Sequence, residues 1–175
     1  MKIAYLACGL THVPKAVFDK YVDAIHGIAS ATRAAVEGLS VKYALVDSDP
    51  QLAQRKPEDK ARLCYLWDRK MVEEADVVIA EASFPSTGLG IELQIAEGND
   101  TPIIILYKDY GCNRATERNY KNPNDSIDHA LQIGEGFVTL MALGMPSIFR
   151  VIRYEDLDDC TRQLADALSL LEKEG

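Results

Sequence analysis

The chain has 175 residues, of which 47% are hydrophobic, and it carries a formal net charge of −8 at pH 7. This length suits one domain, residues 1–175, with a sizeable buried core. The acidic charge argues against duplex nucleic acid as a partner. No stretch approaches the roughly 20 apolar residues of a membrane span, so we expect no membrane partner.

The four cysteines, Cys8, Cys64, Cys112 and Cys160, are widely scattered and contain no Cys-x-x-Cys pair. This spacing argues against a zinc site and against the disulfide framework of a secreted protein. The apolar run that begins at Ile3 and ends at Cys8 is too short for a signal peptide. We therefore expect a cytoplasmic protein.

Hydrophobic patterning predicts strands and helices that alternate along the chain. Short apolar, β-branched runs predict five strands, over residues 2–8, 41–46, 76–80, 102–107 and 148–154. Apolar residues at helical spacing predict helices over residues 14–37, 57–74, 91–98, 126–143 and 157–173. Polar segments 47–56 and 108–125 are expected as loops. The alternation predicts an α/β fold, a flavodoxin/Rossmann-like three-layer sandwich with a five-stranded, mostly parallel sheet.

Folds of this class bind their ligands at the carboxyl ends of the parallel strands. Three segments should therefore converge there: residues 9–12 after the first strand, residues 82–90 after the third, and the chain from residue 108 onward after the fourth. We expect the functional residues to lie on or beside these segments.

The segment from Ala75 to Asn99 combines a buried strand, a turn-forming cluster and a helix start. Gly88 and Gly90 allow a ligand to approach the backbone closely. The first N–H groups of the helix lack intrahelical acceptors and can bind an anion. Glu92 stands at this helix start. A glutamate there can simply complement the helix dipole, but its place beside a glycine-rich cluster also makes it a candidate catalytic carboxylate.

A second carboxylate, Asp68, falls within an apolar stripe of the helix predicted over residues 57–74. Aspartate is rarely buried unless it is paired or functional. Two interpretations follow: either the stripe is rotated and Asp68 pairs with an arginine at the surface, or Asp68 faces the site.

The residues around Glu92 resemble a known family. The third strand ends in Val-Ile-Ala-Glu at residues 78–81, and the pattern Pro-Ser-x-Gly-x-Gly-x-Glu-Leu follows at residues 85–93. This pattern resembles the nucleoside 2-deoxyribosyltransferase family, and within it the 2′-deoxynucleoside 5′-phosphate N-hydrolases. The resemblance is clear over residues 66–106 and extends to residues 1–10.

The resemblance implies roles for individual residues. It implies that Glu92 is the nucleophile that attacks the sugar C1′ and that Asp68 handles a proton. It implies that Ser86 binds the 5′-phosphate, since the hydrolases carry serine there and the nucleoside transferases carry an acidic residue. From the residues alone, Ser86 and the N–H groups around Gly88 can bind phosphate, or Ser86 can cap the helix. Tyr5 resembles a family tyrosine near the catalytic carboxylate, and it is equally suited to be a core aromatic of a strand.

The first loop departs from the family pattern. Gly9 is retained, but the arginine that the hydrolases use for phosphate is absent at the matching place. Thr11 and His12 are the candidates to replace it. Four cations of segment 108–125 are typical of a solvated face and can also supply charge for a phosphate: Lys108, Arg114, Arg118 and Lys121.

These observations predict hydrolysis of the N-glycosidic bond of (2′-deoxy)nucleoside 5′-monophosphates, with catalysis by Glu92, Asp68 and Tyr5. Substrate binding is expected at Gly9, Thr11, Ser86, Gly88 and Gly90. The chemistry requires no metal and no redox cofactor. Two alternatives remain: a nucleoside 2-deoxyribosyltransferase that exchanges bases, and a nucleotide-binding sensor without turnover. The resemblance also implies a homodimer or a higher homo-oligomer.

Overall fold

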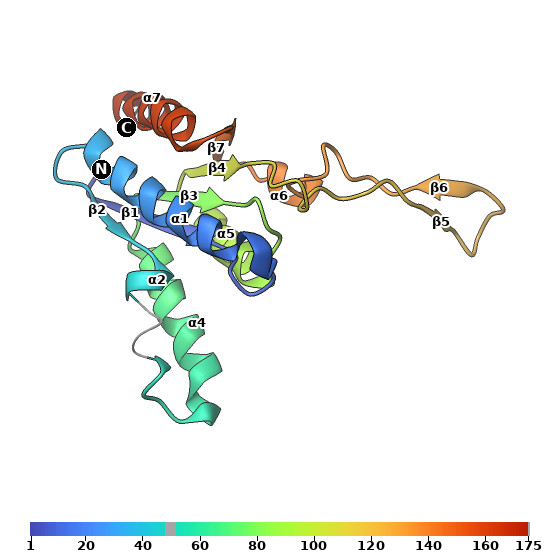
Figure 1. Cartoon of the computed structure of the whole chain (residues 1–175), viewed down its shortest axis with the longest axis horizontal. Helices are drawn as coiled ribbons and strands as arrows, with labels where there is room; N and C mark the ends of the chain where they lie inside the picture. The colour runs from blue at the N-terminus through green and yellow to red at the C-terminus, as the bar shows by residue number, and fades with distance from the viewer. Residues whose placement is uncertain (48–51, 175) are drawn as a thin grey trace.

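The central element is a five-stranded sheet in which every neighbouring pair of strands is parallel (Figure 1). The computed structural model describes residues 1–47 and 52–174. Across the sheet the strands run in the order β2 (Ser40–Lys42), β1 (Ile3–Cys8), β3 (Val77–Glu81), β4 (Ile103–Tyr107) and β7 (Ile148–Arg153). The second strand in sequence therefore lies at one edge and the first lies beside the third, which is the flavodoxin-like order.

Two helices cover each face of the sheet. On one face α1 (Lys15–Ala35) packs beside α7 (Leu157–Glu174), and on the other α4 (Pro57–Glu73) packs beside α5 (Thr87–Gly98). The predicted three-layer sandwich is thus confirmed, with a sheet that is parallel throughout rather than mostly parallel.

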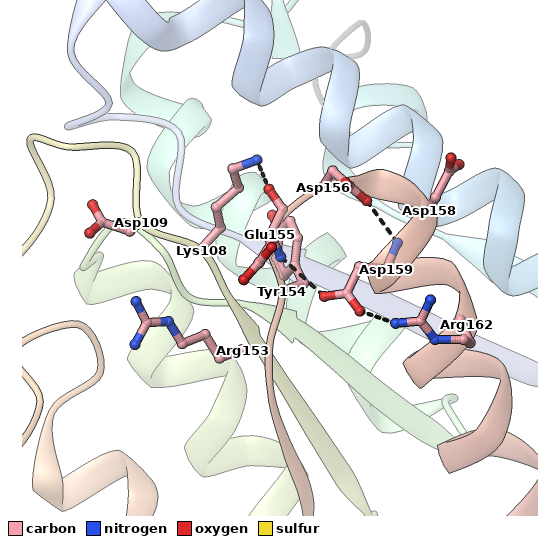
Figure 2. A pocket seen from close by; sticks show the side chains of 9 residues that line it. All are labelled: Lys108, Asp109, Arg153, Tyr154, Glu155, Asp156, Asp158, Asp159 and Arg162. Atoms are coloured by element: carbon pink, nitrogen blue, oxygen red, sulfur yellow. Dashed lines mark hydrogen bonds and ion pairs between the residues drawn. The ribbon is translucent and has the colours of Figure 1, made fainter.

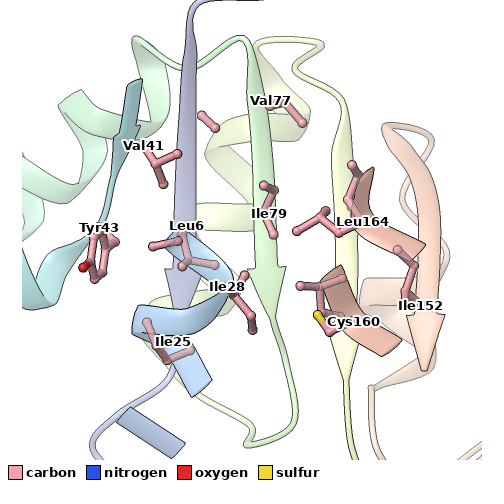
Figure 3. Close-up of a cluster of buried hydrophobic side chains, with 14 of the residues drawn as sticks. Leu6, Ile25, Ile28, Val41, Tyr43, Val77, Ile79, Ile152, Cys160 and Leu164 are labelled. Carbon is pink, nitrogen blue, oxygen red and sulfur yellow. The ribbon is translucent and has the colours of Figure 1, made fainter. Parts of the chain in front are cut away.

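Side chains of each strand alternate between the two cores. Leu6 and Ile79 point into the first core, where they meet Ile25 of α1 and Leu164 of α7 (Figure 3). Tyr5, next to Leu6 in the chain, points into the second core against α5. This alternation decides which polar side chains of a strand can reach α4 and α5. Within residues 1–47 and 52–174, no helix has the length and apolar character needed to cross a bilayer.

The strand predicted over residues 41–46 is wrong beyond Lys42. The chain turns there into the short helix α2 (Ala44–Asp47). The Asp47 carboxylate accepts the Tyr43 N–H at 2.8 Å, and the Asp47 N–H donates to the Tyr43 carbonyl at 2.9 Å. β2 is an edge strand. Among the described residues its one partner is β1, and pairing with β1 keeps only residues 40–42 in an extended conformation. Of the loop expected over residues 47–56, residues 48–51 lie outside the described residues.

Helix α5 begins one turn before its predicted start at Ile91. Ser86 is its N-cap: the Ser86 Oγ accepts the Leu89 N–H at 3.4 Å, and the Gly90 N–H donates to the Ser86 carbonyl at 3.1 Å. Gly88 and Gly90 therefore lie in the first turn of the helix and not in the loop that we predicted. Because a side-chain cap satisfies an N-terminal donor, the helix can begin through two glycines.

The helix predicted over residues 126–143 is mostly wrong. Two short antiparallel strands form here, β5 (Asn119–Lys121) just before the predicted helix and β6 (Asp128–Ala130) within it, and only α6 (Leu140–Leu143) is helical. Strand β5 also interrupts the loop expected over residues 108–125. In Figure 1 the pair extends away from the sheet, and we call residues 116–132 the hairpin arm.

Local turn chemistry explains this departure. The Asn124 N–H donates to the Asn122 Oδ1 at 2.9 Å, which turns the chain between the two strands. Gly134 and Gly136 then adopt φ values of 57° and 87°. These left-handed conformations stop a helix from continuing, although the apolar spacing of the segment favours one.

Candidate active site

The order of the strands reverses between β1 and β3, because the chain leaves β1 toward β2 and leaves β3 toward β4. Open α/β folds bind ligands in the crevice at such a switch point. The two strands end side by side at Cys8 and Glu81. A Cβ atom at Gly9 would lie 2.6 Å from the Ser86 Cβ, so the first and third loops converge here as expected.

Glu92 and Tyr5 form a hydrogen-bonded pair within this region. The Tyr5 hydroxyl donates to the Glu92 Oε1 at 2.5 Å, and the Glu92 side chain is 9% exposed. Burial is the main reason that the pKa of Glu92 rises to about 7; the Tyr5 hydrogen bond lowers it, and the charge of Asp68 raises it. Burial also raises the pKa of Tyr5, so its hydroxyl remains a donor. A carboxylate with this pKa is half ionised near neutrality.

Asp68 of α4 is half-buried and faces the same cavity as Glu92. The cavity has a volume of about 190 Å³ and lies between α4 and α5, where Cys64, Gly88 and Ile91 also line it. The Cys64 Sγ donates to the Asp68 Oδ2 at 3.3 Å. Of the two interpretations of the α4 stripe, the structure favours the one in which Asp68 faces the site. Two carboxylates with different environments meet in one small, mostly apolar cavity.

The first turn of α5 leaves room beside its backbone. A Cβ at Gly88 would meet only the Ser86 Oγ, at 3.6 Å, and a Cβ at Gly90 would meet nothing within 4 Å. The N–H groups at the start of an α-helix have no intrahelical acceptors, so this turn can receive an anion. Gly88 lines the Glu92 cavity, whereas Gly90 and Ser86 line a smaller cavity of about 90 Å³ on the other side of the helix.

The remaining first-loop candidates, Thr11 and His12, are both exposed. His12 lines a separate cavity of about 500 Å³, together with Pro85 and with Arg114 from the segment after β4. The structure thus brings Asp68 and Glu92 together at one cavity, with Tyr5 hydrogen-bonded to Glu92. It brings Gly9 against Ser86, while His12 faces the neighbouring space.

Sequence reasoning missed a second buried carboxylate, Glu81, at the end of β3. It is completely buried, and it accepts hydrogen bonds from the Ser83 hydroxyl, from the Ser83 N–H at 3.3 Å and from the Tyr154 hydroxyl at 2.9 Å. Burial raises the pKa of Glu81, and these donors oppose that effect. The Ser83 Oγ also accepts the Lys108 N–H at 2.8 Å. The feature of the sequence that could have identified Glu81 is a charged residue at the end of a wholly apolar strand.

A larger cavity lies elsewhere, at the ends of β4 and β7 (Figure 2). It measures about 750 Å³, and its polar groups bond mainly to one another: Arg162 pairs with Asp159, and the Lys108 ammonium donates to the Glu155 carbonyl. Its lining carboxylates outnumber its cations. This negative balance suits an anionic substrate poorly.

Comparison with known proteins bears on this geometry. No family model matches the chain. Over 43 residues it is 44% identical to a Syntrophotalea carbinolica protein named "Putative 2′-deoxynucleoside 5′-phosphate N-hydrolase 1". This match confirms the resemblance to the 2′-deoxynucleoside 5′-phosphate N-hydrolases over that segment. The match spans 25% of this chain and 30% of the length of that protein.

Solved structures share the fold. The structure of CMP N-glycosidase from Clostridium botulinum matches with a TM-score of 0.54 and 17% identity, over 93% of this chain and 97% of that one. A conserved protein from Enterococcus faecalis V583 matches with a TM-score of 0.54 and 16% identity, over 95% and 98%. At these identities the likeness concerns the fold alone.

Proposed function

We propose that the protein hydrolyses the N-glycosidic bond of nucleoside 5′-monophosphates, with 2′-deoxynucleotides as the preferred substrates. One observation carries the proposal: Glu92 is buried, accepts a hydrogen bond from Tyr5 and shares its cavity with Asp68. Paired carboxylates with separated roles are what glycosidic cleavage uses. The names of a partial relative and of a structural neighbour point to the same reaction class.

In the proposed mechanism the ionised Glu92 attacks C1′ of the sugar. A C1′–O bond to Glu92 forms as the C1′–N bond breaks, and the electron pair of that bond leaves with the base. Asp68 holds or moves the proton that the leaving base requires. A water molecule then attacks C1′ and gives its proton to Asp68, which has lost one to the base; the C1′–O bond to Glu92 breaks, and the sugar 5-phosphate is released. Tyr5 holds the Glu92 carboxylate in place through its hydroxyl.

Ser86 supports the choice of a nucleotide over a nucleoside. Its hydroxyl caps α5 beside the exposed backbone of Gly88, at the positive end of the helix dipole. Each charge-assisted hydrogen bond to a phosphate contributes about 1.5–3 kcal/mol, or roughly tenfold or more in affinity. No acidic side chain stands at position 86 to oppose a phosphate.

The transferase alternative shares every step up to the attack on the sugar–enzyme intermediate, where a second base replaces water. The sensor alternative binds the nucleotide and leaves it intact. A panel of nucleosides and their 5′-monophosphates, incubated with and without a free acceptor base, separates the three. We expect release of base from nucleotides and no exchange. Exchange with the acceptor would favour the transferase, and binding without turnover would favour the sensor.

The Ser86→Asp variant sharpens this test. Aspartate is as good an N-cap as serine, so the helix should begin normally while the position gains a negative charge. Wild type should have a higher kcat/KM for a nucleotide than for its nucleoside, and the variant should lose that preference. Equal or better use of the nucleoside by wild type would contradict the nucleotide proposal.

We also propose a homo-oligomer, and the hairpin arm supports it. Tyr120, Ile127 and Leu131 of the arm are half or more exposed, and an isolated two-stranded hairpin is only marginally stable in water. Burying these side chains against a second copy would stabilise the arm. Light scattering should give a mass above the 19.4 kDa of one chain; a mass equal to one chain would contradict the proposal.

A further inference from the structure

We propose that the 500 Å³ cavity at the base of the hairpin arm binds the anionic end of the substrate, with Arg114 as its cation. The inference rests on the proposed function, because it names how the 5′-phosphate of that substrate is recognised. It also supplies the positive charge that the first loop of this chain lacks.

The Glu92 cavity is too small to hold a whole nucleotide. That cavity measures about 190 Å³, whereas sites for small molecules span roughly 300–1,000 Å³. It has room for the sugar carbon that Glu92 would attack, but part of a nucleotide must lie outside it. Gly88, in the first turn of α5, lines this cavity, and Ser86, two residues earlier, lines the next one, so a substrate that extends past the start of α5 continues toward the base of the hairpin arm.

The 500 Å³ cavity adjoins Ser86. It shares Pro85, Phe137, Val138 and Thr139 with the smaller cavity that Ser86 lines. His12 enters it from the loop after β1, whose Gly9 lies against Ser86. All three segments that converge at the switch point therefore border the same space.

Arg114 is held in position at this cavity. Its Nε donates to the Glu135 carbonyl at 2.9 Å, and its guanidinium carbon lies 5.8 Å from the centre of the Phe137 ring. The Gly136 backbone, at φ 87°, passes so close that an added Cβ would lie 3.1 Å from the Arg114 Cγ. A guanidinium fixed through Nε keeps its two terminal amino groups, whose planar fork matches the geometry of a phosphate.

Charge distinguishes this cavity from the larger one in Figure 2. Among the described residues that line the 500 Å³ cavity, Arg114 is a cation, His12 adds an imidazole and none is acidic. Thr139 adds a hydroxyl, which caps α6 by accepting the Ala142 N–H and keeps its own proton to donate. The larger cavity has an excess of carboxylates. An anion is therefore expected beside Arg114.

The test compares wild type with Arg114→Gln, and uses Arg118→Gln as a matched control, because Arg118 is exposed on the same segment and does not line the cavity. Calorimetry with 2-deoxyribose 5-phosphate and with 2-deoxyribose measures recognition of the phosphate without any turnover. We expect Arg114→Gln to weaken binding of the phosphate about tenfold or more. We expect Arg118→Gln to bind it within about twofold of wild type, and binding of 2-deoxyribose to be the same in all three.

Kinetics give the second readout. Arg114→Gln should raise KM for a nucleotide and leave kcat/KM for the nucleoside unchanged. Arg114→Lys, which keeps the charge without the fork, should recover part of the loss and also guards against misfolding of the glutamine variant. Equal phosphate binding by wild type and Arg114→Gln would overturn the inference. Normal phosphate binding by a wild type that cleaves no nucleotide would overturn the proposed hydrolysis and leave the cavity assignment standing.

Discussion

Two buried glutamates, Glu92 and Glu81, lie near the carboxyl end of the same strand, β3, on opposite faces of the sheet. Each accepts a hydrogen bond from a tyrosine: Glu92 from Tyr5, and Glu81 from Tyr154. Tyr5 belongs to the core under α4 and α5, and Tyr154 to the core under α1 and α7. Burial raises the pKa of both glutamates. The similarity ends at their surroundings.

Glu92 borders a cavity and has a second carboxylate, Asp68, across it. Glu81 is sealed, and the hydroxyl of Ser83 and the Ser83 N–H add to the bond from Tyr154. Ser83 also accepts the Lys108 N–H and, through its carbonyl, the Asn113 amide at 2.9 Å. Glu81 thus anchors the loop that leads to Ser86. The comparison teaches that burial and a raised pKa do not by themselves mark a reactive group; access to a ligand does.

The most direct test of this difference between Glu92 and Glu81 is to neutralise each glutamate in turn. Glu92→Gln keeps the size of the side chain and an acceptor for Tyr5, but it removes the nucleophile. We expect turnover to fall by several orders of magnitude, because a covalent step has lost its attacking group. Steady-state assays on a nucleotide measure this.

Glu81→Gln is the matched control. It turns an amide nitrogen toward a buried donor, so we expect a loss of about 1–3 kcal/mol in the free energy of unfolding, with turnover of the folded variant within about tenfold of wild type. A Glu92→Gln enzyme that stays within a few-fold of wild type would show that Glu92 is not the nucleophile.

Asp68→Asn should have the next largest effect. The variant should fold and bind substrate, while kcat falls roughly 10²–10⁴-fold, because a group that transfers a proton has been lost. KM should change little. An unchanged kcat, measured with the same nucleotide, would make Asp68 a structural neighbour of Glu92 and no more.

The smallest effects are expected from removing the tyrosine hydroxyl that donates to each glutamate. Glu92 must be ionised to attack, so kcat/KM should fall as pH falls through its pKa of about 7. Tyr5→Phe removes a bond that lowers this pKa, and the acidic limb should move to higher pH. Asp68→Asn removes a charge that raises it, and the limb should move to lower pH.

Tyr154→Phe should leave the pH profile in place. It removes a donor from the sealed carboxylate, so it should lower the free energy of unfolding by about 1–3 kcal/mol. Urea denaturation and pH–rate profiles of the two phenylalanine variants give the comparison. A shifted pH–rate profile in Tyr154→Phe would show that the environment of Glu81 affects the ionisation of Glu92. It would contradict the view that the two glutamates act independently.

The sequence by itself determined the parallel sheet, because apolar β-branched runs that alternate with amphipathic helices leave few other ways to bury both faces. It also indicated the strand, the turn and the helix around Glu92, since a serine, two glycines and a carboxylate close together form a local pattern, although the helix begins one turn earlier than predicted. It placed Asp68 in an apolar stripe of a helix, but it did not show what that stripe faces.

Tertiary structure alone decided the rest. The helix expected over residues 126–143 is divided between the end of the hairpin arm and α6, because Gly134 and Gly136 take left-handed conformations and the Ala115 N–H bonds to the Gly136 carbonyl at 2.7 Å. Glu81 meets Tyr154 across 73 positions of sequence, and Arg114 meets Phe137 only where the arm returns to the sheet. Such partners are distant along the chain, and local propensity carries no information on which distant side chains a fold brings together.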